Sequence, residues 1–183
     1  QCGGFTIAWQ GQTGPDAVPG ATSIWEAIHR AAPHAELSIA DGTDADPGRH
    51  DVAVVVIGEV PYAEGFGDIR EDDNVVVQAG SMIRGSLKTL EPYGQSMVLA
   101  ELHPEELATI RNLNQKGVTV VVVMISGRPL VTHEEMKLAD AFVAAWLPGS
   151  EGTGIADVLF GKAPFSGKLP FPWPTTDGAS LPV

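Results

Sequence analysis

Two apolar runs rich in β-branched residues stand out in the pattern of hydrophobic and polar positions. They span residues 51–58 (DVAVVVIG) and 118–126 (VTVVVVMIS). Neither run alternates with polar residues, so we expect strands that are covered on both faces of a sheet. Shorter apolar segments predict further strand-like pieces at 37–40, 75–77, 96–99 and 141–146.

Apolar residues at helical spacing lie between these strands. One predicted helix follows a Thr22 or Ser23 cap and ends at Pro33. A second opens with Pro104 in its first turn and stops at Gly117. Shorter helices are predicted near 133–138 and 155–159.

The order of these elements predicts the fold class. Strands and helices alternate, which indicates an α/β fold with a mostly parallel sheet flanked by helices, an α/β sandwich with flavodoxin-like layering. A chain of 183 residues with 44% hydrophobic content has room for a single domain with a sizeable core. We expect an extended segment and loop at 1–22, the sandwich core at 23–161 and a C-terminal strap at 162–183. Ligands of such folds sit at the carboxyl ends of the strands.

Charge and composition narrow the range of partners. The formal net charge of −12 would repel nucleic acid and anionic lipid, so we expect neither as a partner. No apolar run approaches the roughly 20 residues that span a bilayer. Cys2 is the single cysteine, which excludes an internal disulfide. The chain begins at Gln1, and its first stretch reads like the middle of a protein, so we expect a piece of a longer polypeptide.

Common cofactor and metal motifs are poorly matched. The glycine runs at 11–14 and 149–154 lack the lysine of a phosphate-binding loop, and Glu151 stands where phosphate would need positive charge. Ser126 lies in a tight SGRP turn rather than a nucleophile elbow. The histidines are scattered without ligand spacing. We therefore expect no metal and no cofactor.

A carboxylate-rich loop follows the first buried strand, at residues 59–71. It carries Glu59, Glu64 and Asp68, and two aromatic residues near the N-terminus, Phe5 and Trp9, could stack on sugar rings. Glycoside hydrolysis needs two carboxyl groups across the scissile bond, one of them protonated. Taken alone, these residues leave open the alternative that the acidic loop is only a solvated face.

Several motifs occur together and in order along the chain. They are GGFTIAWQG (3–11), GEVPYAEGFGD (58–68), ISGRPL (125–130), WLPGSEGTGIADVLFG (146–161) and FSGKLPFPWP (165–174). This set closely resembles the second domain of family 3 glycoside hydrolases of the exo-1,3/1,4-β-glucanase and β-glucosidase type. The resemblance runs from the first residues to about Trp173.

The resemblance implies a shared active site. In that family an upstream (β/α)₈ barrel supplies an aspartate nucleophile, and the second domain supplies the general acid/base of a retaining reaction. The PYxE-like motif places the acid/base on Glu64, with Glu59 and Asp68 as loop support. Trp9 falls on the family's sugar-stacking aromatic, and Phe5 stands where plant relatives carry tryptophan.

Further consequences of the resemblance concern substrate and location. It implies β-linked glucan oligosaccharides as substrates and a secreted or periplasmic enzyme, of which the chain alone is inactive. The alternative is a noncatalytic carbohydrate-binding or interaction module of the same fold. We expect Trp25, Trp146 and Trp173 to fill the core and interfaces, since burial is the commoner use of tryptophan. Arg128 is expected in a buried ion pair or as a brace between loops.

Overall fold

A parallel three-stranded sheet lies at the centre of the computed structural model. Its strands are β1 (Val52–Gly58), β4 (Thr119–Ile125) and β5 (Ala141–Trp146), in the order β1–β4–β5. Residues of β1 pair in continuous register with β4, from Val52 opposite Thr119 to Gly58 opposite Ile125. The structure describes residues 18–40, 42–59, 82–83, 86–87, 96–170 and 172–175.

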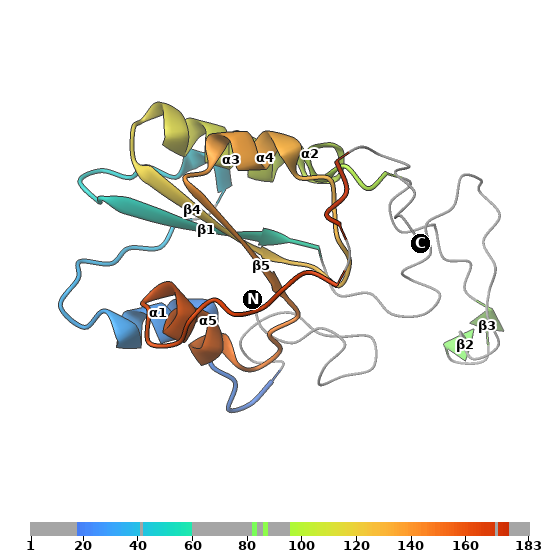
Figure 1. Cartoon of the computed structure of the whole chain (residues 1–183), viewed down its shortest axis with the longest axis horizontal. Coiled ribbons are helices and arrows are strands. Elements are labelled where there is room, and N and C mark those ends of the chain that lie inside the picture. The colour runs from blue at the N-terminus through green and yellow to red at the C-terminus, as the bar shows by residue number, and fades with distance from the viewer. Residues whose placement is uncertain are drawn as a thin grey trace.

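Helices cover both faces of the sheet (Figure 1). On one face lie α2 (Leu99–Leu102), α3 (Pro104–Gln115) and α4 (His133–Leu138). On the other lie α1 (Ile24–Ala31) and α5 (Gly152–Leu159), which contact each other. The described part of the chain also includes the short elements η2 (Gly42–Asp44), β2 (Met82–Ile83) and β3 (Ser86–Leu87). The predicted α/β class with a mostly parallel sheet is confirmed.

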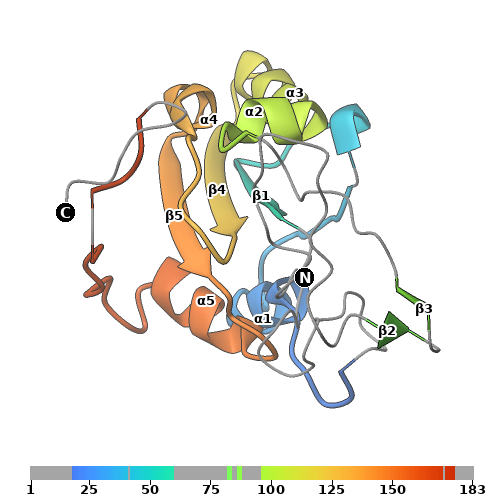
Figure 2. The ribbon, with the colours of Figure 1, turned by 90° about the vertical axis from the view of Figure 1, so that its right-hand side faces the viewer.

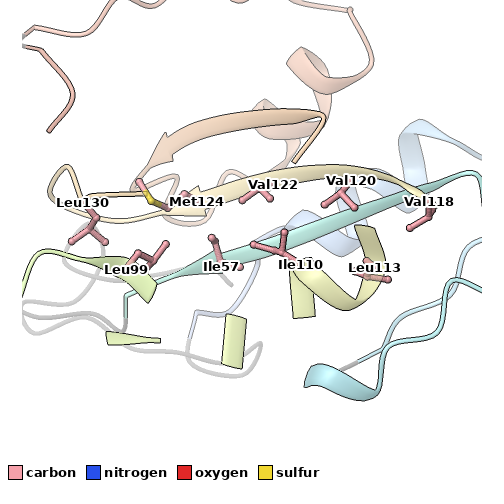
Figure 3. Packing of buried hydrophobic residues seen from close by; sticks show 9 residues of the cluster. All are labelled: Ile57, Leu99, Ile110, Leu113, Val118, Val120, Val122, Met124 and Leu130. Atoms are coloured by element: carbon pink, nitrogen blue, oxygen red, sulfur yellow. The ribbon is translucent and has the colours of Figure 1, made fainter. Parts of the chain in front are cut away.

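The central strand divides its side chains between two cores. Val122 and Met124 of β4 belong to a cluster with Ile110 of α3, which Figure 3 shows in full. Val123 and Ile125 belong to the cluster on the opposite face, beneath α1 and α5. Successive strand residues point to opposite faces, so a strand that is apolar at every position is buried on both sides. This arrangement is what the run at 118–126 predicts. The same expectation for the run at 51–58 is wrong for its first half, because β1 is an edge strand in which Val52 is 50% and Val54 is 37% exposed.

The start of α1 is fixed by a reciprocal cap. Ser23 Oγ accepts a hydrogen bond from the Glu26 N–H at 3.1 Å, and a Glu26 carboxylate oxygen accepts from the Ser23 N–H at 2.8 Å. The Ser23 backbone bond is the main cause that lowers the pKa of Glu26. Gly152 packs against this cap, because a Cβ there would lie 2.5 Å from the Thr22 carbonyl oxygen. The capping box therefore also sets where α5 meets α1.

Most predicted elements are confirmed, among them the helix from Pro104 to Gln115 and the strand at 141–146. The strand predicted at 37–40 is wrong. That segment has no ladder with β1, and side-chain contacts tie it instead to the loop before β1: Ser38 Oγ lies 2.8 Å from His50 Nε2. A cavity of about 470 Å³ lies between the segment and β1.

The strand-like piece predicted at 96–99 is wrong as well. Val98 makes one isolated bridge with Val131, and its carbonyl then accepts hydrogen bonds from the Glu101 and Leu102 N–H groups. The chain thus turns into the helical turn α2 before a ladder can extend. The piece predicted at 75–77 lies outside the described residues. The division into 1–22, 23–161 and 162–183 stays a prediction.

Candidate functional site at the carboxyl end of the sheet

The carboxyl ends of β1 and β4 lie side by side, and the chain leaves both strands at the same edge. Figure 2 shows the sheet between the helices α2, α3 and α4 on one side and α1 and α5 on the other. Glu59 directly follows β1, and its N–H donates to the Ile125 carbonyl at 3.0 Å. Ser126 directly follows β4. Parallel pairing therefore brings the Glu59 loop and the SGRP turn together, although 67 positions separate Glu59 from Ser126.

Glu59, Ser126 and Arg128 form a buried polar group, which we call the Glu59 cluster. Arg128 donates from Nε and Nη2 to Glu59 Oε1 at 2.9 and 2.6 Å. Ser126 Oγ lies 2.7 Å from Glu59 Oε2 and 2.8 Å from the Arg128 carbonyl, and its single proton serves one acceptor at a time. Arg128 N–H donates to Ser126 Oγ at 3.2 Å. Glu59 Oε1 thus has two donors, and Oε2 has one when the Ser126 hydroxyl turns toward it.

Because the Glu59 cluster is buried, removing one of its charged side chains should strongly destabilise the fold. The side chain of Glu59 is 1% exposed and that of Arg128 is 13% exposed. Removal of one partner of a buried ion pair costs roughly 3–5 kcal/mol, because the other charge stays behind in a poorly solvating environment. The cluster therefore fixes Glu59, the first residue of the carboxylate loop, to the turn that follows β4.

Gly58 allows the two strand ends to approach closely. Its φ is +144°, and a Cβ at this position would lie 1.8 Å from the Ile125 carbonyl oxygen. Any other residue would have to move the backbone of one strand. The glycine in the GE pair at 58–59 is thus required by local geometry, and it places Glu59 at the turn after β4.

Two further carboxyl groups lie on the α3 and α4 side of β1, the half-buried Glu106 and the buried Glu135. Glu106 Oε1 accepts a hydrogen bond from the Gly58 N–H at 3.3 Å, and Oε2 is buried with no partner among the described residues. Burial raises the pKa of Glu106 to about 7, and the charges of Glu105 and Glu135 add to the rise. Glu135 is 1% exposed, with both carboxylate oxygens buried and without a partner in the described part of the chain. Burial is also the main cause that raises its pKa.

The structure describes one of the five predicted site residues. Glu59 lies in the cluster at the strand ends, whereas Phe5, Trp9, Glu64 and Asp68 lie outside the described residues. Their roles stay predictions. Arg128 does form the predicted buried ion pair.

Sequence reasoning missed the carboxyl groups of Glu106 and Glu135. Both stand in the first turn of a helix, where acidic residues are common because they oppose the helix dipole. Nothing in the sequence distinguishes a buried glutamate from an exposed one at such a position. One weak signal exists, namely that Glu106 is followed by Leu107, Ile110 and Leu113 on the buried face of α3.

Two tryptophans, Trp146 at the end of β5 and Trp173, pack against each other. The rings of Trp146 and Trp173 lie 5.9 Å apart at 59°, and Trp173 Nε1 donates to Thr132 Oγ1 at 3.2 Å. Trp173 also packs against the α3-side core. Both residues act as packing groups, as predicted. Trp25 is only half-buried.

No group of three or more His, Cys, Asp or Glu residues that could hold a metal ion occurs within the described ranges. None of the helices described is both long enough and apolar enough to cross a membrane.

These features define an open α/β domain whose carboxyl-edge loops start from a buried ionic cluster. The chain matches the family described as "Glycosyl hydrolase family 3 C-terminal domain" over residues 2–183. It therefore belongs to glycosyl hydrolase family 3, as a C-terminal domain.

Curated relatives are named as glycosidases. A lysosomal beta glucosidase of Dictyostelium discoideum is 29% identical over 96% of this chain and 20% of its own length. A periplasmic beta-glucosidase of Salmonella typhimurium is 44% identical over 40% of this chain and 10% of its own length. The chain thus spans about a fifth or less of these relatives.

Solved structures agree with the fold. An exo-1,3/1,4-beta-glucanase from a Pseudoalteromonas species is 32% identical, with a TM-score of 0.64, over 86% of this chain and 17% of that one. A beta-glucosidase from Listeria innocua, solved with isofagomine, shares the fold at 20% identity and a TM-score of 0.51, over 78% of this chain and 18% of that one.

Proposed function

We propose that this domain supplies the general acid/base of a retaining exo-acting hydrolase of β-glucans and β-glucosides. The nucleophile, an aspartate, lies in an upstream barrel domain of the same polypeptide. Support comes from the family, from relatives named as β-glucosidases and an exo-1,3/1,4-β-glucanase, and from their much greater length. The substrates are β-linked glucan oligosaccharides.

The Glu59 cluster is the observation that carries the proposal. Glu64, the proposed acid/base, stands five positions after Glu59. Because Arg128 and Ser126 hold the Glu59 carboxylate, the loop that carries Glu64 starts from a fixed point at the carboxyl edge of the sheet. This edge is where open α/β folds bind their ligands.

The chemistry assigns two protonation states to one residue. Protonated Glu64 donates to the glycosidic oxygen while the barrel aspartate attacks the anomeric carbon and forms a glycosyl-enzyme. Glu64, now ionised, then accepts a proton from the water that hydrolyses this intermediate. The two carboxyl groups of a retaining enzyme are about 5–5.5 Å apart, so Glu64 projects into the barrel mouth.

Glu59 is unsuited to the acid/base role. Both of its oxygens accept hydrogen bonds from Arg128 or Ser126, and its side chain is 1% exposed, so it has no access to a sugar. We therefore assign Glu59 to loop support. Asp68 is the remaining competitor of Glu64 in the loop.

The test uses the intact polypeptide and three matched variants: Glu64→Gln, Asp68→Asn and Glu59→Gln. We expect Glu64→Gln to lower turnover of phenyl β-glucoside by roughly 10²–10⁴-fold, since general acid catalysis is worth that much. Azide should restore turnover of 2,4-dinitrophenyl β-glucoside in this variant alone, with β-glucosyl azide as product. Azide rescue of Asp68→Asn in its place would refute the assignment of Glu64.

A second measurement tests the shared site. The 183-residue chain alone should not hydrolyse laminaribiose, whereas the intact polypeptide should. Activity of the isolated chain would contradict a nucleophile outside it. Binding of laminaribiose without hydrolysis by the intact polypeptide would favour the noncatalytic carbohydrate-binding module.

Trp9 and Phe5 are proposed to line the leaving-group subsite. Aromatic rings stack on sugar faces, so Trp9→Ala should raise KM for laminaribiose more than for an aryl glucoside. Equal effects on both substrates would argue against this subsite.

The proposal also includes the location of the protein, which we expect to be exported. Relatives named lysosomal and periplasmic support a secreted or periplasmic location. Cell fractionation of the native host, with a cytosolic enzyme as the marker, tests it.

A further inference from the structure

The end of β1 is held from α3 by a carboxyl group that the proposed chemistry does not use. Glu106, in the first turn of α3, accepts the Gly58 N–H through Oε1 at 3.3 Å. The next N–H along the chain, that of Glu59, donates to the Ile125 carbonyl of β4 at 3.0 Å. Two consecutive peptide groups are thus bound by different elements, one by α3 and one by β4.

These two contacts act at the point where the carboxylate loop begins. The contact to β4 is an ordinary extension of the sheet, and Arg128 reinforces it from the side-chain end of Glu59. The contact to Glu106 is a hydrogen bond that joins the end of β1 to the helices on its other side. Without it, only the β4 contact and the Arg128 ion pair hold the Gly58 and Glu59 peptides.

We propose that Glu106 is a positioning residue for the carboxylate loop. By holding the Gly58 peptide against α3, it sets the direction in which the loop begins. This inference rests on the proposed function of Glu64. Glu106 touches neither sugar nor water in the reaction, so its effect reaches the chemistry through the backbone at 58–59 and the placement of Glu64.

The surroundings of Glu106 favour its neutral form. The groups that act on its carboxyl are Glu105 on the same helix, Glu135 on α4 and the Gly58 N–H on β1. Both charged neighbours are acidic, and burial raises the pKa of Glu106 to about 7. Glutamine at this position keeps the acceptor oxygen and the shape of the protonated acid, whereas leucine keeps only the volume.

The experiment uses the intact polypeptide and four variants: Glu106→Gln, Glu106→Leu, Glu105→Gln and Glu64→Gln. Glu105→Gln is the matched control, because Glu105 is the preceding residue of α3 and its side chain is 65% exposed. Rates are measured on phenyl β-glucoside, whose poor leaving group needs the acid, and on 2,4-dinitrophenyl β-glucoside, which leaves without it.

We expect Glu106→Leu to lower kcat for the phenyl glucoside at least about tenfold more than kcat for the dinitrophenyl glucoside, a partial loss of the roughly 10²–10⁴-fold effect of a general acid. Glu106→Gln should keep both rates, with KM unchanged, and Glu105→Gln should match the wild type. Equal losses on both substrates, or none, would overturn the inference, because a merely structural role does not distinguish leaving groups.

The pH profile serves as a second readout if Glu106→Leu fails to fold. Ionisation of Glu106 adds a negative charge beside Glu105 and Glu135 and alters its hydrogen bond with the Gly58 N–H, so phenyl glucoside turnover of the wild type should change as pH rises through about 7. In Glu106→Gln this change should be absent. Identical profiles would overturn the inference. If Glu64→Gln lowers kcat equally for both leaving groups, the proposed function itself is refuted. If Glu64→Gln lowers kcat mainly for the phenyl glucoside but Glu106→Leu changes neither rate, only this inference is refuted.

Discussion

The half-buried carboxyl of Glu106 should make the stability of this domain fall as pH rises from acidic to neutral. Its pKa is about 7 in the folded state, against an ordinary value of 4.5. Below pH 4.5 both folded and unfolded states hold the proton. Between 4.5 and 7 the folded state holds more protons than the unfolded state, so the free energy of unfolding decreases with pH.

The magnitude follows from the size of the shift. Each pKa unit corresponds to about 1.4 kcal/mol, so the difference between 4.5 and about 7 is worth roughly 3 kcal/mol, all of it lost above pH 7. Glu106→Gln removes the titrating proton and keeps the acceptor for Gly58. We therefore expect the variant to lack this part of the pH dependence.

Urea unfolding of the 183-residue domain from about pH 4.5 to 8 measures the effect. Glu105→Gln is the control: the charge of Glu105 is a smaller cause of the raised pKa of Glu106 than burial, so this variant should keep most of the wild-type slope. The quantity of interest is the difference in unfolding free energy between wild type and Glu106→Gln, which isolates the titration of Glu106 and its interaction with Glu135. A difference that stays constant within about 0.5 kcal/mol over this range would refute the argument that Glu106 is held neutral by burial.

Three other sets of substitutions test the packing around the site. Arg128→Ala should lower the free energy of unfolding by about 3–5 kcal/mol. A double-mutant cycle of Arg128→Ala with Glu59→Gln, measured by urea unfolding, should give a coupling energy above about 1 kcal/mol. If the two substitutions lower the free energy of unfolding additively, they contradict a buried ion pair. Gly152→Ala should lower the free energy of unfolding by about 1–3 kcal/mol or more, because the new Cβ would lie 2.5 Å from backbone atoms. Gly154→Ala in the same helix should raise it by up to about 1 kcal/mol, because a Cβ there meets nothing within 4 Å. Equal Tm values for the two variants would contradict the close approach at Gly152. Ser23→Ala should cost about 1 kcal/mol in thermal unfolding through loss of the capping box, and an unchanged Tm would count against that cap.

Much of the fold could be predicted from local patterns. The helix from Pro104 to Gln115 and the strand at 141–146 carry their signals in their own residues: a proline at the first turn, a glycine stop and a run of apolar side chains. The strand expected at 37–40 fails because a strand needs a partner. Apolar content alone does not show that Ser38 and its neighbours bind the preceding loop of β1 instead.

The candidate site was predictable in part, for a related reason. That Glu59 follows an apolar strand is visible in the sequence, but its bond to Arg128 joins residues 69 positions apart and depends on the register of β1 with β4. The contact from Glu106 to Gly58 spans 48 positions and depends on the rotation of α3 about its axis. Register and helix rotation arise from packing of the whole core, so no local pattern encodes them.

The Glu59 cluster also limits where the reaction can take place. A chain extends by at most about 3.3–3.6 Å per residue, so five steps place the Cα of Glu64 within about 18 Å of the Cα of Glu59. Because Glu59 is fixed to the turn after β4, the proposed shared site requires that a barrel nucleophile lie within reach of this edge of the sheet. A shift of the acid by about 1 Å can cost on the order of 100-fold in rate. Under the proposed function, the contacts of Glu59 and Glu106 affect the rate through geometry, and a structure of the intact polypeptide with the barrel nucleophile far from this edge would contradict the assignment of Glu64.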